Sequence, residues 1–189
     1  MSVLSQSVIR DRLGLQVDDR RSLVVTPFIE SALDADSLDL RLGHHFLFPR
    51  LHAQAAVDTE NGTPRSELSV HIPAGGDLVL PAHQTVLGAT LEFIKLPFDV
   101  SGQILTKSSV ARSFLVIETA PWIHPNYRGC LTLEIANVSN STLILHPRMR
   151  IGQLILLSID QPAEIEDLSG TYVGPVRPEA PPNQMLHRH

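Results

Sequence analysis

The stretch that decides the fold class is VLGATLEFIKL, residues 86–96. Successive side chains of an extended strand point to opposite faces of a sheet. In this stretch the apolar residues at positions 87, 89, 91 and 93 share one face, and Thr90 and Glu92 share the other. That two-residue period predicts a β-strand rather than a helix.

The same alternation returns several times downstream. It occupies residues 104–106, 115–117, 131–136, 142–145 and 151–159, with turn-forming pairs at Pro125-Asn126, Asn140-Ser141 and Pro147-Arg148. Short strands at intervals of about 8–12 residues are typical of a sandwich, a jelly roll or a barrel. The sequence therefore predicts a mainly β fold.

Only the beginning of the chain has a helical pattern. Apolar residues at positions 4, 8, 9 and 13 have the spacing of one helix face, Ser5 is a candidate N-cap, and Gly14 stands where helices often end. At the other end, the chain from residue 170 is rich in proline and has no apolar period. We therefore predict a β domain over residues 1–169 that begins with a short helix, and a tail over residues 170–189 that closes over a ligand.

Composition limits what the chain can do. With 189 residues, 43% of them apolar, and a net charge of −5, it can bury a core but cannot hold nucleic acid by bulk charge. No apolar run approaches the ~18–20 residues of a membrane span, and no signal peptide is visible. Cys130 is the only cysteine, which excludes an intrachain disulfide and a zinc site with several thiolates. These features predict a cytoplasmic protein with no membrane and no nucleic-acid partner.

Glu134 is the first candidate for chemistry. It lies in LTLEIAN, residues 131–137, where Leu131, Leu133 and Ile135 share one face and leave Glu134 on the other. A carboxylate in so apolar a strand either faces solvent or sits in a pocket that suits a general acid or base. The alternation alone favours the solvent-facing arrangement, because charged residues are rarely buried.

A second candidate is KSSVAR, residues 107–112. It holds two cations and two hydroxyls and no acidic side chain. Such a segment resembles an anion-binding turn, although surface loops often have the same composition. The nine histidines lack the spacing of metal ligands, so no protein metal site is predicted.

KSSVAR is also similar to the RSSxAR signature of the dCTP deaminase family, which belongs to the trimeric dUTPase-like superfamily. Other segments resemble that family in the same order along the chain. They are SLDLRLG at 37–43, ATLEF with Leu96-Pro97 at 89–97, Thr119-Ala120 followed by WIHPNYRG at 122–129, LTLEIAN at 131–137 and PRMRIGQL at 147–154. Matches in the same order from about residue 2 to 157 indicate the family more specifically than any single segment does.

The resemblance implies a distorted β-barrel or jelly roll of the dUTPase-like type with a short N-terminal helix. It also implies a homotrimer with active sites at subunit interfaces. The implied reaction is hydrolytic deamination of a cytosine deoxynucleotide, first of all dCTP to dUTP and ammonia. No zinc centre is expected, and Mg²⁺ is expected to arrive with the triphosphate.

The resemblance further implies roles for individual residues. Glu134 is the acid and base that activates the attacking water, and Arg112 holds its carboxylate in place. Ser108 and the main-chain carbonyl of Ala120 orient that water. The residues implied to bind the substrate are Lys107, Ser109, Trp122, Ile123, His124, Gln153 and Tyr172.

Three departures from the family pattern keep other functions open. His124 replaces a hairpin aspartate, Arg148 replaces the glycine of a turn, and Thr171 replaces a lysine of the tail. His124 is either a packed histidine or an imidazole that faces the sugar or phosphate. Arg148 requires either a turn without positive φ or a strained residue. The alternative functions are a dUTP pyrophosphatase, alone or after deamination, and a nucleotide-binding homologue without catalysis.

Overall fold

A computed structural model describes residues 2–50, 66–117, 120–160 and 174–179. Thr171, Tyr172 and most of the predicted tail lie outside these ranges. The helices are α1 (Gln6–Leu13), η1 (Glu30–Ala32, a 3₁₀ helix) and α2 (Ser108–Ala111). The strands are β1 (Val24–Thr26), β2 (Ser37–Arg41), β3 (His45–Arg50), β4 (Ser66–His71), β5 (Leu78–Leu80), β6 (Thr85–Lys95), β7 (Val100–Thr106), β8 (Leu115–Val116), β9 (Trp122–Ile123), β10 (Arg128–Asn137), β11 (Leu143–Leu145) and β12 (Arg150–Ser158).

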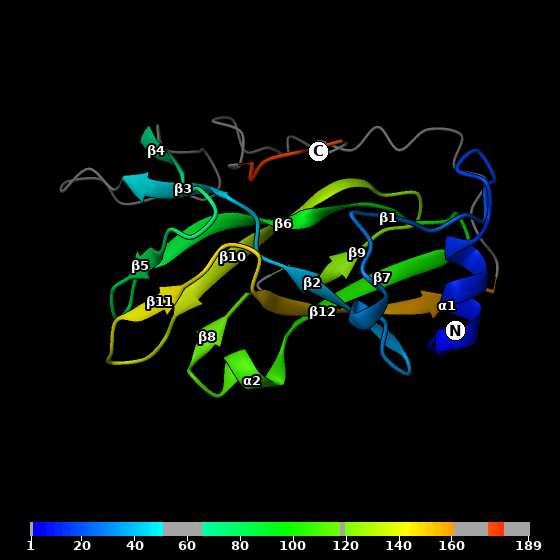
Figure 1. Cartoon of the computed structure of the whole chain (residues 1–189). Helices are drawn as coiled ribbons and strands as arrows, with labels where there is room; N and C mark the ends of the chain where they lie inside the picture. The colour runs from blue at the N-terminus through cyan, green and yellow to red at the C-terminus, as the bar shows by residue number, and fades with distance from the viewer. Residues whose placement is uncertain (1, 51–65, 118–119, 161–173, 180–189) are drawn as a thin grey trace, which may run out of the picture.

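These strands form three sheets (Figure 1). The largest has the order β4-β3-β6-β10-β8, and β1 pairs with a further part of β6. A four-stranded sheet has the order β2-β12-β7-β9, and β5 pairs with β11. The predicted mainly β fold is confirmed, and the strands that the structure describes separate into three sheets rather than closing into one barrel.

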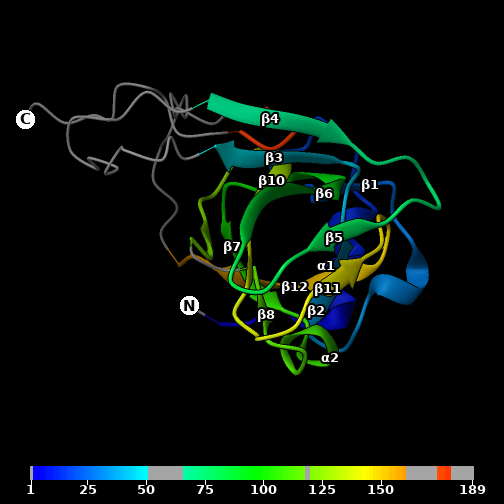
Figure 2. The ribbon, with the colours of Figure 1, turned by 90° about the vertical axis from the view of Figure 1, so that its left-hand side faces the viewer.

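The sheets curve around a shared apolar core, as the view along the molecule shows (Figure 2). Leu40 from β2, Phe46 from β3, Leu133 from β10 and Leu154 from β12 are each fully buried in it. Burial of side chains of this size, at about 1.5–3 kcal/mol each, is the main force that holds the sheets together.

The long strand β6 differs from its sequence pattern in one respect. The face with Thr90 and Glu92 is the more deeply buried one, whereas Leu87 and Leu91 on the other face are half-buried. The polar side chains are satisfied inside: the Thr90 hydroxyl donates to the Glu92 carbonyl and accepts from the Leu131 amide. Buried polar groups are tolerated when they are hydrogen-bonded. The alternation of polar and apolar residues along β6 therefore did not reveal which face points into the core.

The predicted N-terminal helix is confirmed as α1 and ends at Gly14 as expected, but the predicted Ser5 side-chain cap is not formed. Ser5 occupies the N-cap position without a side-chain cap bond, and its hydroxyl lies 3.0 Å from that of Ser7 instead. Gly14 ends the helix in the right-handed region, with φ −79°. The helix is therefore held by packing of Ile9, which is fully buried, rather than by a side-chain N-cap.

Arg148 occupies the position of a turn that usually requires glycine. The Met149 amide donates to the His146 carbonyl, and Arg148 between them has φ +75°. Of the two alternatives open from the sequence, the strained residue is the one found. The Arg148 amide also donates to the Leu42 carbonyl at 2.7 Å, which fixes the turn against the end of β2.

We expect Arg148→Gly to unfold at a higher urea concentration than Arg148→Ala, because only glycine enters the left-handed region without a Cβ clash. The expected difference in free energy of unfolding is roughly 1 kcal/mol. Both variants remove the same exposed charge, so their comparison isolates the backbone. Equal or greater stability of the alanine variant would contradict a left-handed residue at this turn.

Candidate functional site

The four-stranded sheet carries a buried carboxylate with two cationic partners. Asp39 on β2 has a side chain only 8% exposed. The Lys107 ammonium donates to both of its oxygens, at 2.6 and 2.8 Å. Arg150, the first residue of β12, donates from Nη1 to one of them at 3.1 Å. We call Asp39, Lys107 and Arg150 the Asp39 cluster.

Gln153 lies beside this cluster. It is the cross-strand partner of Asp39 between β12 and β2, and its amide donates to the Ser37 hydroxyl at 2.7 Å. Two residues predicted to bind phosphate, Lys107 and Gln153, are therefore brought to the same part of β2. Ser109 follows in α2, exposed.

Glu134 lies on the other sheet, on the outward face of β10. Its cross-strand partner is Leu87 of β6, whose own partner is Leu47 of β3, so the carboxylate stands at the end of an apolar row. The residue is half-buried, which is intermediate between the two arrangements open from the sequence. Among the described residues its side chain has no hydrogen bond or ion pair, unlike the carboxylate of Asp39.

Among the described residues, no hydrogen bond or ion pair joins Glu134 to the other predicted catalytic residues. Ser108 and Arg112 lie at the two ends of α2, both exposed and without a side-chain partner in the described ranges. Ala120 is exposed after an undescribed pair of residues. β8, which follows α2, pairs with β10 at Val116 and Ala136, so the connection between the two parts is short.

The predicted hairpin residues are divided between core and surface. Ile123 is buried and pairs with Gly102 of β7, whereas Trp122 is 44% exposed. His124, the next residue, is exposed. Packing within the described part of one chain therefore does not bury His124, and its role toward a ligand stays a prediction.

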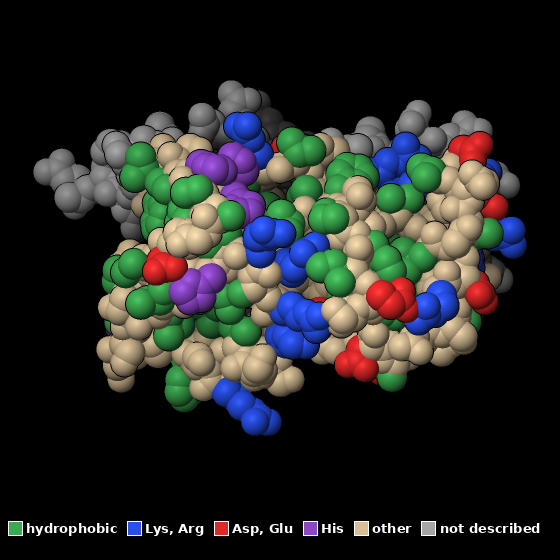
Figure 3. Space-filling view, in the orientation of Figure 1, with side chains coloured by type: hydrophobic (Ala, Val, Ile, Leu, Met, Phe, Trp, Pro, Cys, Tyr) green, Lys and Arg blue, Asp and Glu red, His purple; other side chains and the backbone are tan. Residues whose placement is uncertain are grey.

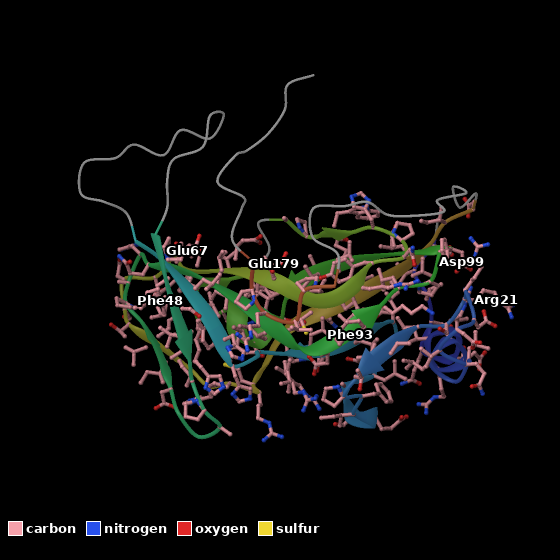
Figure 4. The ribbon with its side chains drawn as sticks, turned by 90° about the horizontal axis from the view of Figure 1, so that it is seen from above. Arg21, Phe48, Glu67, Phe93, Asp99 and Glu179 are labelled. Carbon is pink, nitrogen blue, oxygen red and sulfur yellow. The ribbon has the colours of Figure 1, made fainter. Side chains whose placement is uncertain are left out.

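The segment 174–179 lies along the outer edge of β10. Its Gly174 amide donates to the Arg128 carbonyl, and its Pro175 carbonyl accepts from the Cys130 amide, both at 2.7 Å. The Glu179 amide donates to the hydroxyl of Thr132, two residues before Glu134. Figure 4 shows Glu179 above the middle of the sheet. Part of the predicted tail is therefore positioned beside the strand of the candidate catalytic residue.

Burial shifts the pKa values of three ionisable groups near this segment in the direction of the neutral form. Burial raises the pKa of the Cys130 thiol, and it raises that of Tyr127, whose hydroxyl donates to the Cys130 carbonyl. Burial also lowers the pKa of His45 on β3, with a further contribution from Arg177 of the segment. The ring of His45 lies 4.7 Å from that of His71.

No cluster of three or more His, Cys, Asp or Glu side chains that could hold a metal ion exists within the described ranges. The role of Mg²⁺ and the expected independence of zinc therefore stay predictions. None of the helices in the described part of the chain is long and apolar enough to cross a membrane.

Two residues of the Asp39 cluster were not identified as functional from the sequence. Asp39 and Arg150 stand 111 positions apart, and both belong to segments that carried the family resemblance. The alternation of polar residues at 37, 39 and 41 was the available signal, since it places Ser37 and Asp39 on one face of β2.

Comparisons with known proteins agree with this fold. Residues 3–159 match the family described as dCTP deaminase-like. A protein of Corynebacterium kroppenstedtii named "dCTP deaminase, dUMP-forming" is 32% identical over 165 residues, which cover 87% of this chain and 88% of that one. A protein of Mycolicibacterium smegmatis with the same name is 37% identical over 147 residues, covering 76% and 77%.

A solved structure shares the fold. The crystal structure of 2′-deoxycytidine 5′-triphosphate deaminase from Agrobacterium tumefaciens aligns with a TM-score of 0.60 and 21% identity, over 81% of this chain and 47% of that one. This chain therefore spans about half the length of that structure, and the likeness concerns the fold. By its architecture the protein is one of the mainly β proteins, with three sheets around a shared apolar core. With residues 3–159 matched, the chain belongs to the dCTP deaminase-like family.

Gly129→Ala tests how the segment 174–179 is held. A Cβ at this glycine, whose φ is +148°, would lie 2.5 Å from Cδ of Pro175, so the segment must move away from β10. We expect hydrogen exchange at the Cys130 amide to become at least about tenfold faster, because its acceptor is the Pro175 carbonyl.

Gly14→Ala is the matched control, since a Cβ there meets nothing closer than 3.5 Å. Unchanged exchange at Cys130 in the Gly129→Ala protein would show that the segment does not depend on this close approach.

Proposed function

We propose that this protein catalyses the hydrolytic deamination of dCTP. The observation that carries the proposal is Glu134, a half-buried carboxylate that ends an apolar row and has no partner among the described residues. It stands in a chain whose residues 3–159 match the dCTP deaminase-like family, and the relatives named above carry that activity in their names.

In the proposed mechanism Glu134 is both base and acid. It takes a proton from the water that attacks C4 of cytosine and delivers protons to N3 and to the departing amine. Water and dCTP are consumed, and the first products are dUTP and ammonia. A positioned acid and base of this kind contributes about 10²–10⁴-fold to the rate.

Other residues would position the reactants. Ser108 and the carbonyl of Ala120 orient the water, and Arg112 stabilises the carboxylate and the developing charge. Lys107, Ser109 and Gln153 would meet the phosphates, and Mg²⁺ would enter bound to the triphosphate. The exposed imidazole of His124 would face the sugar or a phosphate. No zinc is required by this route, because the carboxylate activates the water.

The same proposal includes a homotrimer that works in the cytoplasm, with sites at subunit interfaces. A second subunit is needed if Ser108 and Arg112 are to reach a Glu134 carboxylate that they do not contact within the described part of one chain. Large apolar side chains support an interface, since Phe114 is 63% exposed and Trp122 is 44% exposed.

A second candidate concerns the final product. From the sequence, dUTP is favoured, because His124 replaces the aspartate that dUTPases use. The relatives are named for forming dUMP, which favours loss of pyrophosphate after deamination. A non-catalytic nucleotide-binding role is the third and weakest candidate.

Glu134→Gln tests the role of the carboxylate. The amide keeps the shape of the side chain but cannot accept the proton, so we expect kcat for ammonia release from dCTP to fall at least ~10²-fold while dCTP still binds almost normally. Glu67→Gln, the same change at an exposed residue of β4, is the control. A wild-type rate in the Glu134 variant would remove this residue from the mechanism.

Product analysis separates the candidate reactions. Purified protein with dCTP and Mg²⁺ is expected to release ammonia, and dUMP with pyrophosphate if the second step follows. Accumulation of dUTP without pyrophosphate would restrict the enzyme to deamination. Binding of dCTP with no turnover at high enzyme concentration would leave only the non-catalytic role.

A further inference from the structure

The Asp39 cluster holds Lys107 in a position that competes with phosphate binding. Both of its short hydrogen bonds, 2.6 and 2.8 Å, go to the Asp39 carboxylate, which is 8% exposed. These two bonds use two of the three N–H donors of the ammonium, so it must give up at least one of them to bind a phosphate with more than a single hydrogen bond. A buried carboxylate that loses its cation is strongly disfavoured, so this movement needs a second cation that stays behind.

Arg150 has the geometry of that second cation. It donates from Nη1 to the Asp39 carboxylate at 3.1 Å, and from Nη2 to the hydroxyl of Ser31 in η1 at 2.7 Å. The second bond anchors the guanidinium independently of Lys107. Since the guanidinium is planar and always charged, it can neutralise Asp39 alone when the ammonium leaves.

The surroundings favour departure of Lys107 toward solvent. Its side chain is 28% exposed, and Lys and Arg side chains gather on this face over β2 and the start of β12 (Figure 3). Glu92, a second buried carboxylate, is already bound by Arg41 at 2.6 Å. An anion is therefore the natural new partner for the ammonium.

We propose that Arg150 is a positioning residue that releases Lys107 from Asp39 to a phosphate of the nucleotide. The inference rests on the proposed function in one respect, that a nucleotide triphosphate approaches Lys107. Arg150 itself keeps its bond to Asp39 and does not touch the substrate.

Arg150→Gln is the first test. With Asp39 left to Lys107 alone, the ammonium is held more tightly. We expect Kd and KM for dCTP to rise at least about tenfold, the size of one lost charged hydrogen bond, while kcat stays within about twofold. Arg148→Gln is the matched control, because it removes an exposed arginine two residues before Arg150 that has no carboxylate partner in the described ranges. An equal rise in Kd in both variants would mean that the arginines attract the phosphates only through the overall positive charge of this surface, and it would overturn the proposal.

The second test repeats the change in an Asp39→Asn background. Asparagine has no charge to hold Lys107, so Arg150→Gln should change Kd there by less than about twofold. If Arg150 instead contacted phosphate directly, its loss would weaken binding equally in both backgrounds. That additive result would overturn a positioning role. The neutral side chain at 39 also avoids an unpaired buried charge, so the double variant is expected to fold.

The third test observes Lys107 directly. The chain has only two lysines, Lys95 and Lys107, so ¹³C-labelled lysine yields one ε-methylene signal from each. Lys95 is the internal reference, since its ammonium is fixed by the Ser22 hydroxyl and two carbonyls. Inorganic tripolyphosphate or dCTP should move the Lys107 signal and leave that of Lys95 in place. An unmoved Lys107 signal at saturating ligand would overturn the proposal.

The two proposals fail separately. A protein that deaminates nothing, but whose Lys107 signal responds to tripolyphosphate in an Arg150-dependent way, supports the release of Lys107 and removes the deaminase function. A protein that deaminates dCTP with an unmoved Lys107 signal supports the function and removes the release.

Discussion

The ion pair between Arg41 and Glu92 joins the two main sheets, and the positions of both candidate sites depend on it. Arg41 ends β2 in the four-stranded sheet, whereas Glu92 belongs to β6 in the six-stranded one. The carboxylate accepts from the Arg41 side chain at 2.6 Å and from its backbone amide at 2.9 Å. The chain then crosses between the sheets at Gly43, where a Cβ would lie 2.8 Å from the Ala89 carbonyl oxygen. Only glycine allows so close a crossing.

Both candidate sites lie on strands connected to the Arg41–Glu92 ion pair, one on β2 and the other on β10. Asp39 stands two residues before Arg41 on β2, so the register of that strand determines where Lys107 and Arg150 are held. Glu134 stands on β10, which pairs with β6 along nearly its whole length. A change at this junction would therefore alter the positions of the Asp39 cluster and of Glu134 together.

The three buried or half-buried acidic residues of these strands differ in whether their carboxylates have cationic partners. Glu92 and Asp39 are paired with cations and bonded at short distance, which is what a carboxylate shielded from water requires. Glu134 has no partner among the described residues and faces apolar neighbours. Paired acids hold the fold, whereas an acid left without a partner is available for proton transfer, and this contrast distinguishes Glu134 better than its sequence pattern does.

The amino-acid sequence by itself determined the class of fold and the later strands. The alternation at β6, β10 and β12 and the turn at Pro147-Arg148 follow from local residue preference, which depends only on neighbours in the chain. The short strands of the first half, such as β2 and β3, were not predicted individually. The sequence did not reveal which side of β6 is buried, because Thr90 and Glu92 find hydrogen-bond partners on other strands.

The tertiary structure alone decided that the Asp39 carboxylate binds Lys107, 68 positions away, and that Arg150 binds the same carboxylate. Contacts between residues so far apart depend on strand order and register, which local patterns do not contain.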